Sequence, residues 1–165
     1  MDFDGLPEED WKGFRDAASA ASGIEAQANT VLSLLIEACT TQRSLIEAKI
    51  VLTKSEGANE LALLETPFGK GRLVLSWEMT PTELLGNMIC ERQRFDEYDR
   101  VCWEPVWGLK IPRYENPYSS ANEKGLKIEL DGSFRDDKIM SIYRAILSMT
   151  YSLINGPVLI SKQVA

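Results

Sequence analysis

Residues 73–111 read LVLSWEMTPTELLGNMICERQRFDEYDRVCWEPVWGLKI, and this stretch decides the fold. Every second residue at its start is large and apolar: Leu73, Leu75, Trp77 and Met79. A period of two is typical of a strand that has one face in the core and the other in solvent. Thr80-Pro81 interrupts the pattern, and an acidic turn at 96–99 separates two further apolar runs, Leu84–Phe95 and Arg100–Ile111. The stretch therefore predicts an antiparallel meander with one face buried.

The segments beside this meander extend the predicted sheet. Leu61–Thr66 is a short apolar run, and Phe68–Gly71 joins it to the meander as a hairpin turn. This turn contains two glycines and a lysine, but it lacks the spacing of a phosphate-binding loop. Residues 126–130 alternate once more, whereas residues 48–54 fit either a helix or a strand. We therefore expect residues 49–130 to be mainly β, in a sheet of four to six strands.

Residues 7–48 have helical periodicity. Ser22-Gly23 either ends a first helix or only weakens it. A second amphipathic stripe begins at Ile24, and we expect its helix to end near Ser44–Ala48. A helix running from Ile24 to Lys54 would be about 46 Å long. That length exceeds the width of a small domain, so it would favour a dimer.

Residues 133–155 predict the clearest helix of the chain. Ser133 and Asp136 form a variant of the capping box, and Asn155-Gly156-Pro157 supplies stop signals. Its predicted buried stripe consists of Phe134, Ile139, Ile142, Tyr143, Ile146, Leu147, Leu153 and Ile154. Residues 158–160 could add an edge strand, and residues 1–6 could be disordered.

Together these segments predict a single α+β domain over residues 1–165. It has an N-terminal helical segment, an antiparallel β-meander of four to six strands, and a C-terminal amphipathic helix packed on the sheet. One face of such a sheet can remain open to water or to a partner.

The composition excludes several kinds of chemistry, because the 165 residues include no histidine. The chain cannot form a Ser-His-Asp or Cys-His nucleophile pair, or a zinc site that uses histidine. Its formal net charge of −7 disfavours nonspecific binding to nucleic acid. Its apolar runs are too short for a membrane span, and its N-terminus is acidic, unlike a signal peptide. We expect no membrane contact, no metal and no cofactor.

The cysteines indicate a reducing, cytoplasmic setting. Cys39, Cys90 and Cys102 are odd in number and are not spaced as CxxC, so we expect buried thiols that pack as small apolar groups. Cys90 and Cys102 are the one pair that could meet, but the sequence offers no base to form a thiolate.

Clustered acids are the other source of possible chemistry. The cluster around the turn at 96–99 consists of Glu91, Asp96, Glu97, Asp99 and Glu104. Paired carboxylates support glycosidase-like or metal-dependent reactions, but acids in a tight turn are usually solvated turn formers. We therefore predict no catalytic residue.

The register of the hairpin Leu84–Ile111 decides which side chains meet, and the sequence leaves two registers open. In one, Arg94 faces Arg100 and Arg92 faces Cys102. In the other, Arg92 faces Trp103 and could stack on its indole ring. The tryptophans fit either a core or an Arg–Trp recognition surface.

The loop Pro112–Lys124 is the second candidate contact region. It contains two prolines and two tyrosines, which suit either a simple connection or a contact loop. The predicted binding residues of both regions are Arg92, Arg94, Trp103, Trp107, Arg113, Tyr114 and Tyr118.

Three functions remain open for such a chain. We favour a nonenzymatic protein-binding module (an inhibitor, immunity-type factor, chaperone or adaptor) that binds another protein, which could be basic, through an acidic body and an Arg/Trp/Tyr surface. The alternative is a small-molecule-binding domain with a pocket between sheet and helix, lined by Trp77, Trp103 or Trp107. The third is an enzyme that uses carboxylates or Cys102. A homodimer is compatible with each of them.

Overall fold

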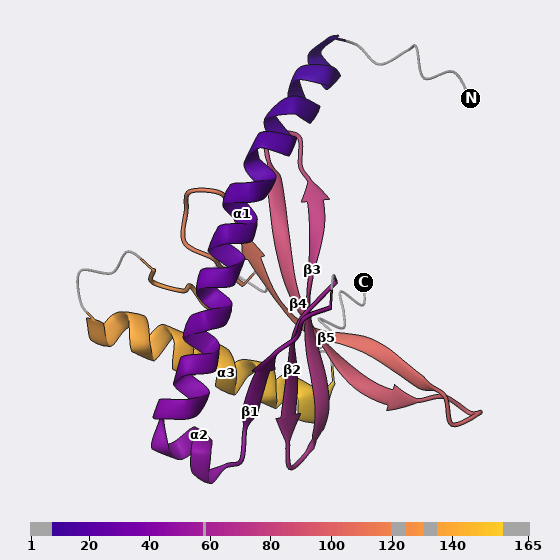
Figure 1. The fold of residues 1–165 in the computed structure, drawn as a ribbon, viewed down its shortest axis with the longest axis vertical. Helices are drawn as coiled ribbons and strands as arrows, with labels where there is room; N and C mark the ends of the chain where they lie inside the picture. The colour runs from indigo at the N-terminus through magenta and orange to yellow at the C-terminus, as the bar shows by residue number, and fades with distance from the viewer. Residues whose placement is uncertain (1–7, 58, 120–124, 131–134, 157–165) are drawn as a thin grey trace, which may run out of the picture.

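The computed structural model describes residues 8–57, 59–119, 125–130 and 135–156, and Figure 1 shows their arrangement. A long N-terminal helix, a five-stranded antiparallel sheet and a C-terminal helix on that sheet confirm the predicted α+β class. The helices are α1 (Glu8–Thr41), α2 (Arg43–Glu47) and α3 (Arg135–Asn155). The strands, adjacent in sequence order, are β1 (Val51–Lys54), β2 (Glu60–Thr66), β3 (Gly69–Met79), β4 (Leu84–Phe95) and β5 (Val101–Ile111). The predictions for residues 1–6, Ser133, Phe134, Pro157 and 158–160 lie outside the described residues.

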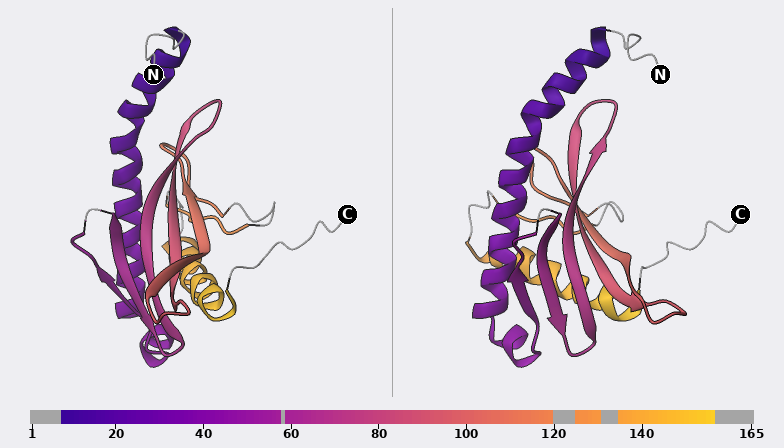
Figure 2. Two further views of the ribbon diagram at one scale, coloured as in Figure 1. Left: turned by 90° about the vertical axis from the view of Figure 1, so that its right-hand side faces the viewer. Right: turned by 45° about the vertical axis from the view of Figure 1, so that its right-hand side comes forward.

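The first helix is continuous through Ser22-Gly23. It has 34 residues, which corresponds to about 51 Å. The Arg113 side chain lies against the helix at Gly23, where an added Cβ atom would be 3.4 Å from Cγ of Arg113, an ordinary van der Waals contact. The first turns of α1 extend beyond the sheet (Figures 1 and 2). None of the described helices combines the length and the apolar character needed to cross a bilayer.

A left-handed residue ends the helical segment before the sheet. Lys49 has φ 56°, and the backbone N–H of Ile50 donates to the carbonyl of Leu45 at 3.1 Å. This geometry closes a helix end and turns the chain into β1. The alternative of a helix from Ile24 to Lys54 is therefore wrong, and Val51–Lys54 is a strand.

The core lies on one face of the sheet, beneath α1 and α3. The strands contribute buried side chains at alternate positions: Leu52, Ala62, Leu64, Leu73, Met88, Cys90, Leu109 and Ile111. The helices contribute Ile24, Ala28, Val31, Leu32, Leu35, Ile142, Ala145, Ile146, Met149 and Leu153. The strands bury every second side chain and the helices bury side chains about 3.6 residues apart, and both sets pack into one apolar layer.

The β4–β5 hairpin has neither of the two expected registers. Arg94 pairs with Cys102, Arg92 pairs with Glu104, and a bulge lies next to Cys90. The turn is wider than expected because the Asp96 carboxylate accepts hydrogen bonds from the backbone N–H groups of Tyr98 and Arg100. Asp99 completes this turn in the left-handed region, with φ 58°.

The strand predicted at residues 126–130 is also wrong. The backbone of this segment bonds to the preceding loop rather than to β5: Ile128 N–H donates to the Pro117 carbonyl at 2.8 Å, and Leu130 N–H donates to the Asn116 side chain at 3.2 Å. Single bridges join Tyr118 to Lys110 and to Lys127. The buried Ile128 explains the apolar pattern, because it packs into the core without a strand around it.

The close approach of α1 to β4 at Gly86 gives a first prediction. A Cβ atom there would lie 2.7 Å from Cγ2 of Ile24 and 3.2 Å from Cδ1 of Leu75. We expect Gly86→Ala to lower the free energy of unfolding by about 1–3 kcal/mol through overpacking. Urea unfolding followed by circular dichroism measures this change. The control is Gly108→Ala on β5, where the nearest atom to a new Cβ would be 3.8 Å away. Equal stability of the two variants would contradict the packing described for α1.

Candidate interaction surfaces

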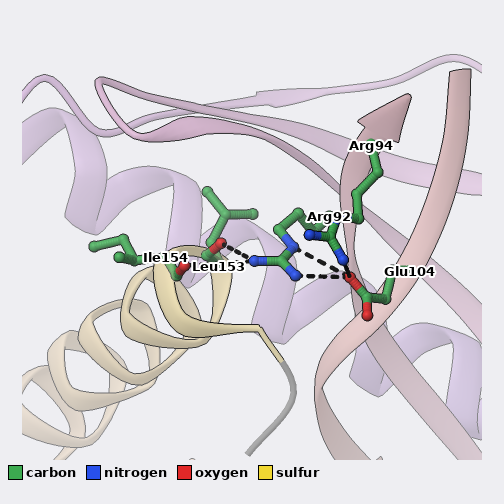
Figure 3. Close-up of polar contacts among 5 residues, drawn as sticks. All are labelled: Arg92, Arg94, Glu104, Leu153 and Ile154. Carbon is green, nitrogen blue, oxygen red and sulfur yellow. Dashed lines mark hydrogen bonds and ion pairs between the residues drawn. The ribbon is translucent and has the colours of Figure 1, made fainter. Parts of the chain in front are cut away.

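Arg92 joins β4, β5 and the end of α3 (Figure 3). Its guanidinium donates to the Glu104 carboxylate at 2.8 Å and 3.3 Å, and to the carbonyls of Leu153 and Ile154 at 3.3 Å and 3.4 Å. The last carbonyls of a helix lack intrahelical partners and carry partial negative charge, so a cation there stabilises the helix end. The side chain of Arg92 is only 17% exposed. These contacts hold the end of α3 on β4 and β5, and a binding role for Arg92 stays a prediction.

Arg94 binds the same carboxylate from the outside. Its Nη1 lies 3.2 Å from Oε2 of Glu104, and its side chain remains 55% exposed. The hydrogen bond from Arg92 is the largest cause that lowers the pKa of Glu104, and the charges of both arginines add to it. The Glu104 carboxyl therefore remains ionised at neutral pH, and Arg94 is the more exposed of its two arginine partners.

Two other acids of the predicted cluster, Glu91 and Asp96, belong to separate ion pairs. Glu91 binds Arg72 at 2.9 Å on the sheet face away from the helices. Hydrogen bonds from Arg100 and Tyr98 lower the pKa of Asp96, which holds the β4–β5 turn. Within the described residues, no group of three or more acidic or cysteine side chains could hold a metal ion. These acids thus serve turns and strand pairs, as clustered acids in turns usually do.

The two candidate tryptophans of β5 lie on opposite faces of the sheet. Trp107 packs against the core, and its Nε1–H donates to Oγ of Ser148 in α3 at 3.1 Å. Trp103 is half-buried on the open face, where the Arg72 guanidinium lies 4.4 Å from the ring centroid. An Arg–Trp stack therefore exists, but its arginine is Arg72 of β3, not Arg92. The sequence could not identify it because the contact crosses β4 diagonally.

The predicted contact residues after β5 lie near the N-terminal half of α1. The Arg113 guanidinium is 4.8 Å from the Tyr114 ring centroid, and Tyr114 is 79% exposed. Tyr118 is half-buried and bridges Lys110 and Lys127 through its backbone. The structure thus brings Arg113 and Tyr114 together but separates them from the Arg92 region.

A groove opens between the N-terminal half of α1 and the β3–β4 hairpin. Its volume is about 270 Å³. The residues that line this α1–hairpin groove are Gly13, Asp16, Ala17, Ala20, Met79, Thr80, Pro81, Thr82, Glu83, Leu84, Arg113 and Tyr114. Two of the predicted binding residues therefore belong to a concave surface, and α1 supplies the other wall.

A second hollow, of about 280 Å³, lies between α1 and the sheet. It is lined by Glu25, Ala28, Asn29, Asn59, Leu61, Leu75 and Trp77. Of the three tryptophans proposed for a pocket between sheet and helix, Trp77 lines this hollow.

The surface that sequence reasoning missed is the outer face of α3. Ile139, predicted to be buried, is 36% exposed; Leu147 and Ile154, also predicted to be buried, are 43% and 45% exposed. Met140 and Tyr151 lie on the same face and are 46% and 61% exposed. A signal was present, since the apolar residues of this helix cover more than the one face that a single core requires.

The cysteines differ in their surroundings. Cys39 and Cys90 are buried, as expected, and burial raises the pKa of their thiols to about 11 and about 12. Both are therefore protonated at neutral pH. Cys102 is exposed, contrary to the expectation, because it lies near the hairpin end, beyond the cover of α3.

Comparison with protein-family models, curated proteins and solved structures finds no match for this chain. Its function is therefore argued from the surfaces described above.

The two arginines on Glu104 give a second prediction. Arg92→Gln should lower the free energy of unfolding by about 1–3 kcal/mol, because it removes a half-buried ion pair and two bonds to the end of α3. Arg94→Gln should cost about 0.5 kcal/mol or less, because exposed ion pairs contribute little. Urea unfolding of both variants at neutral pH tests this difference. An Arg94→Gln variant that is as unstable as Arg92→Gln would show that Arg92 does not hold the end of α3.

Proposed function

We propose that this chain is a nonenzymatic, cytoplasmic protein-binding module, acting as an inhibitor, immunity-type factor, chaperone or adaptor. The observation that carries the proposal is the α1–hairpin groove, which Tyr114 borders with one of the most exposed aromatic rings in the described structure. The free thiols of Cys39, Cys90 and Cys102 support a reducing compartment.

The shape of the groove suits an apolar side chain of a partner. One face of α1 presents Gly13, Ala17 and Ala20 to the groove, and the small size of these residues leaves room for a partner's side chain. Met79 and Leu84 form the opposite apolar wall, and Met79 is 54% exposed. Methionine adapts to differently shaped partners because its side chain is flexible and polarizable. A volume of about 270 Å³ accommodates one or two large side chains rather than a whole helix.

The charges of the groove favour a basic partner segment. Asp16 and Glu83 line it, against one cation, Arg113. The chain as a whole carries a net charge of −7, which would speed the encounter with a basic partner. We therefore infer an occupant that presents an apolar side chain next to a lysine or arginine.

Photo-crosslinking in the source cells tests this proposal. A benzophenone amino acid at Tyr114 should form a defined adduct with one protein, because Tyr114 borders the groove. The purified partner should then bind the unlabelled chain at least 10-fold more weakly after Tyr114→Ala or Asp16→Lys, as measured by calorimetry.

The matched control is Tyr98, on the β4–β5 turn. It is 70% exposed and is stacked by Arg100 at 5.0 Å, much as Tyr114 is stacked by Arg113. The benzophenone at Tyr98 should give no such adduct, and Tyr98→Ala should leave the affinity unchanged. Equal adducts from both positions, or an affinity that Asp16→Lys leaves intact, would rule out the groove as the binding site.

The second candidate function is small-molecule binding in the Trp77 hollow. Its volume of about 280 Å³ is close to the lower limit of ligand pockets. The apolar side chains Leu61 and Leu75 would contact a ligand, and Glu25, Asn29 and Asn59 offer polar groups. This arrangement fits a small polar metabolite better than a drug-sized molecule.

A thermal-shift screen against metabolites tests this alternative. A true ligand should raise the melting temperature of the unmodified chain and change the fluorescence of Trp77. Both effects should disappear in Asn29→Trp, which fills the hollow, and should persist in Tyr98→Ala. A shift that survives Asn29→Trp would place the ligand elsewhere.

A further inference from the structure

Helix α3 is apolar on two opposite faces. Its inner face packs into the core through Ile142, Ala145, Ile146, Met149 and Leu153. Its outer face carries what we call the α3 outer stripe: Met140, Arg144, Leu147, Tyr151 and Ile154, all exposed. A helix at the surface of a monomer normally presents polar residues on that side. Single exposed apolar side chains are normal on a monomer, but four large ones on one helix face form a patch.

The outer stripe has the spacing of a helix-pairing seam. Met140, Leu147 and Ile154 recur every seven residues, and Arg144 and Tyr151 repeat at the same interval between them. A repeat of seven keeps a stripe facing a neighbouring helix along its length. From Met140 to Ile154 the stripe is about 21 Å long. Its natural occupant is therefore another helix.

We propose that the α3 outer stripe is a homodimer interface, in which α3 packs antiparallel against α3 of a second copy of this chain. The twofold axis passes beside Leu147. This surface is separate from the α1–hairpin groove, so the proposal goes beyond the binding function given above.

The stripe is complementary to itself in this arrangement. Met140 and Ile154 lie seven residues to either side of Leu147, so a twofold axis there places Met140 against Ile154 of the second copy. Leu147 then meets its own equivalent. Arg144 comes next to Tyr151 of the second copy, where a guanidinium can stack on the ring.

The helix dipoles set the direction of the pair. The charges of the first turn do not, because Arg135 and Lys138 accompany Asp136 and Asp137 there. Antiparallel packing places the partly positive N-terminus of each helix beside the partly negative C-terminus of the other, whereas a parallel pair would place like ends together.

The size of the stripe sets the expected affinity. A standard interface hides roughly 800 Å² per partner, which is more than one helix face of this length provides. We therefore expect a dimer with a dissociation constant in the micromolar range. Light scattering and sedimentation from about 1 to 500 μM should show a monomer–dimer equilibrium within the micromolar range.

Disulfide trapping tests the register of the pair. In a Cys102→Ser background, which removes the exposed thiol, Leu147→Cys should link to itself under mild oxidation because it lies at the axis. Met140→Cys alone should not link. A mixture of Met140→Cys and Ile154→Cys chains should form the mixed dimer. Self-linking of Met140→Cys as fast as that of Leu147→Cys would overturn the antiparallel register.

A charge at the axis tests the surface itself. Leu147→Glu should make the chain monomeric at all concentrations, with an unchanged circular dichroism spectrum. The control is Phe14→Glu, at an apolar side chain of α1 that is 65% exposed and lies off the stripe, which should leave dimerisation unchanged. A native chain that is monomeric up to 500 μM, or a dimer that persists in Leu147→Glu, would overturn the proposal. Neither result bears on the groove, whose test uses Tyr114.

Discussion

Burial of one sheet face beneath two crossing helices is the constraint on which the rest of this structure depends. Helix α1 packs mainly on β1 and β4, and α3 packs on β3 and β5. Both helices need close approach to the strands, which Gly86 provides beneath Ile24 and Gly71 provides beneath Leu153. Once that face is covered, each helix retains an outer side, and the β4–β5 hairpin extends past the end of α3 (Figure 1). The candidate interaction surfaces are the parts that this packing leaves uncovered.

The sequence predicted the elements that have a strong period and missed those set by single contacts. Alternation in β3 and the helical period of residues 7–48 were sufficient for the α+β class, because one buried layer requires both. The hairpin register was not predictable, because it depends on the Asp96 side chain in the turn and on a bulge beside Cys90. At Ser22-Gly23 the sequence left two alternatives open, and in the structure α1 continues through both residues.

For the candidate sites, residue type alone did not separate structural from exposed roles. Arg92 and Arg94 are two residues apart and share one carboxylate, yet the end of α3 encloses the first and leaves the second in solvent. Leu147 and Ile154 matched a core stripe by spacing, but one helix has only one inner face, and Ile142, Ile146 and Leu153 already occupy it. Apolar side chains for which the core has no room remain on the surface, where they mark a candidate binding face.

The groove and the α3 outer stripe are compatible because α3 meets α1 away from the groove. The groove lies beside Gly13–Ala20, whereas α3 approaches α1 near Leu34 and Ala38. Leu34 follows Ala20 by fourteen positions along the helix, which separates these regions by about 21 Å. A dimer formed through α3 would therefore leave both grooves open. Two sites in one particle raise the apparent affinity for a partner that presents two copies of the bound segment, since the second binding event is intramolecular. A dimer of modest affinity is then sufficient for bivalent binding. A partner bound in both grooves would stabilise the dimer, and the dimer would hold the two grooves together.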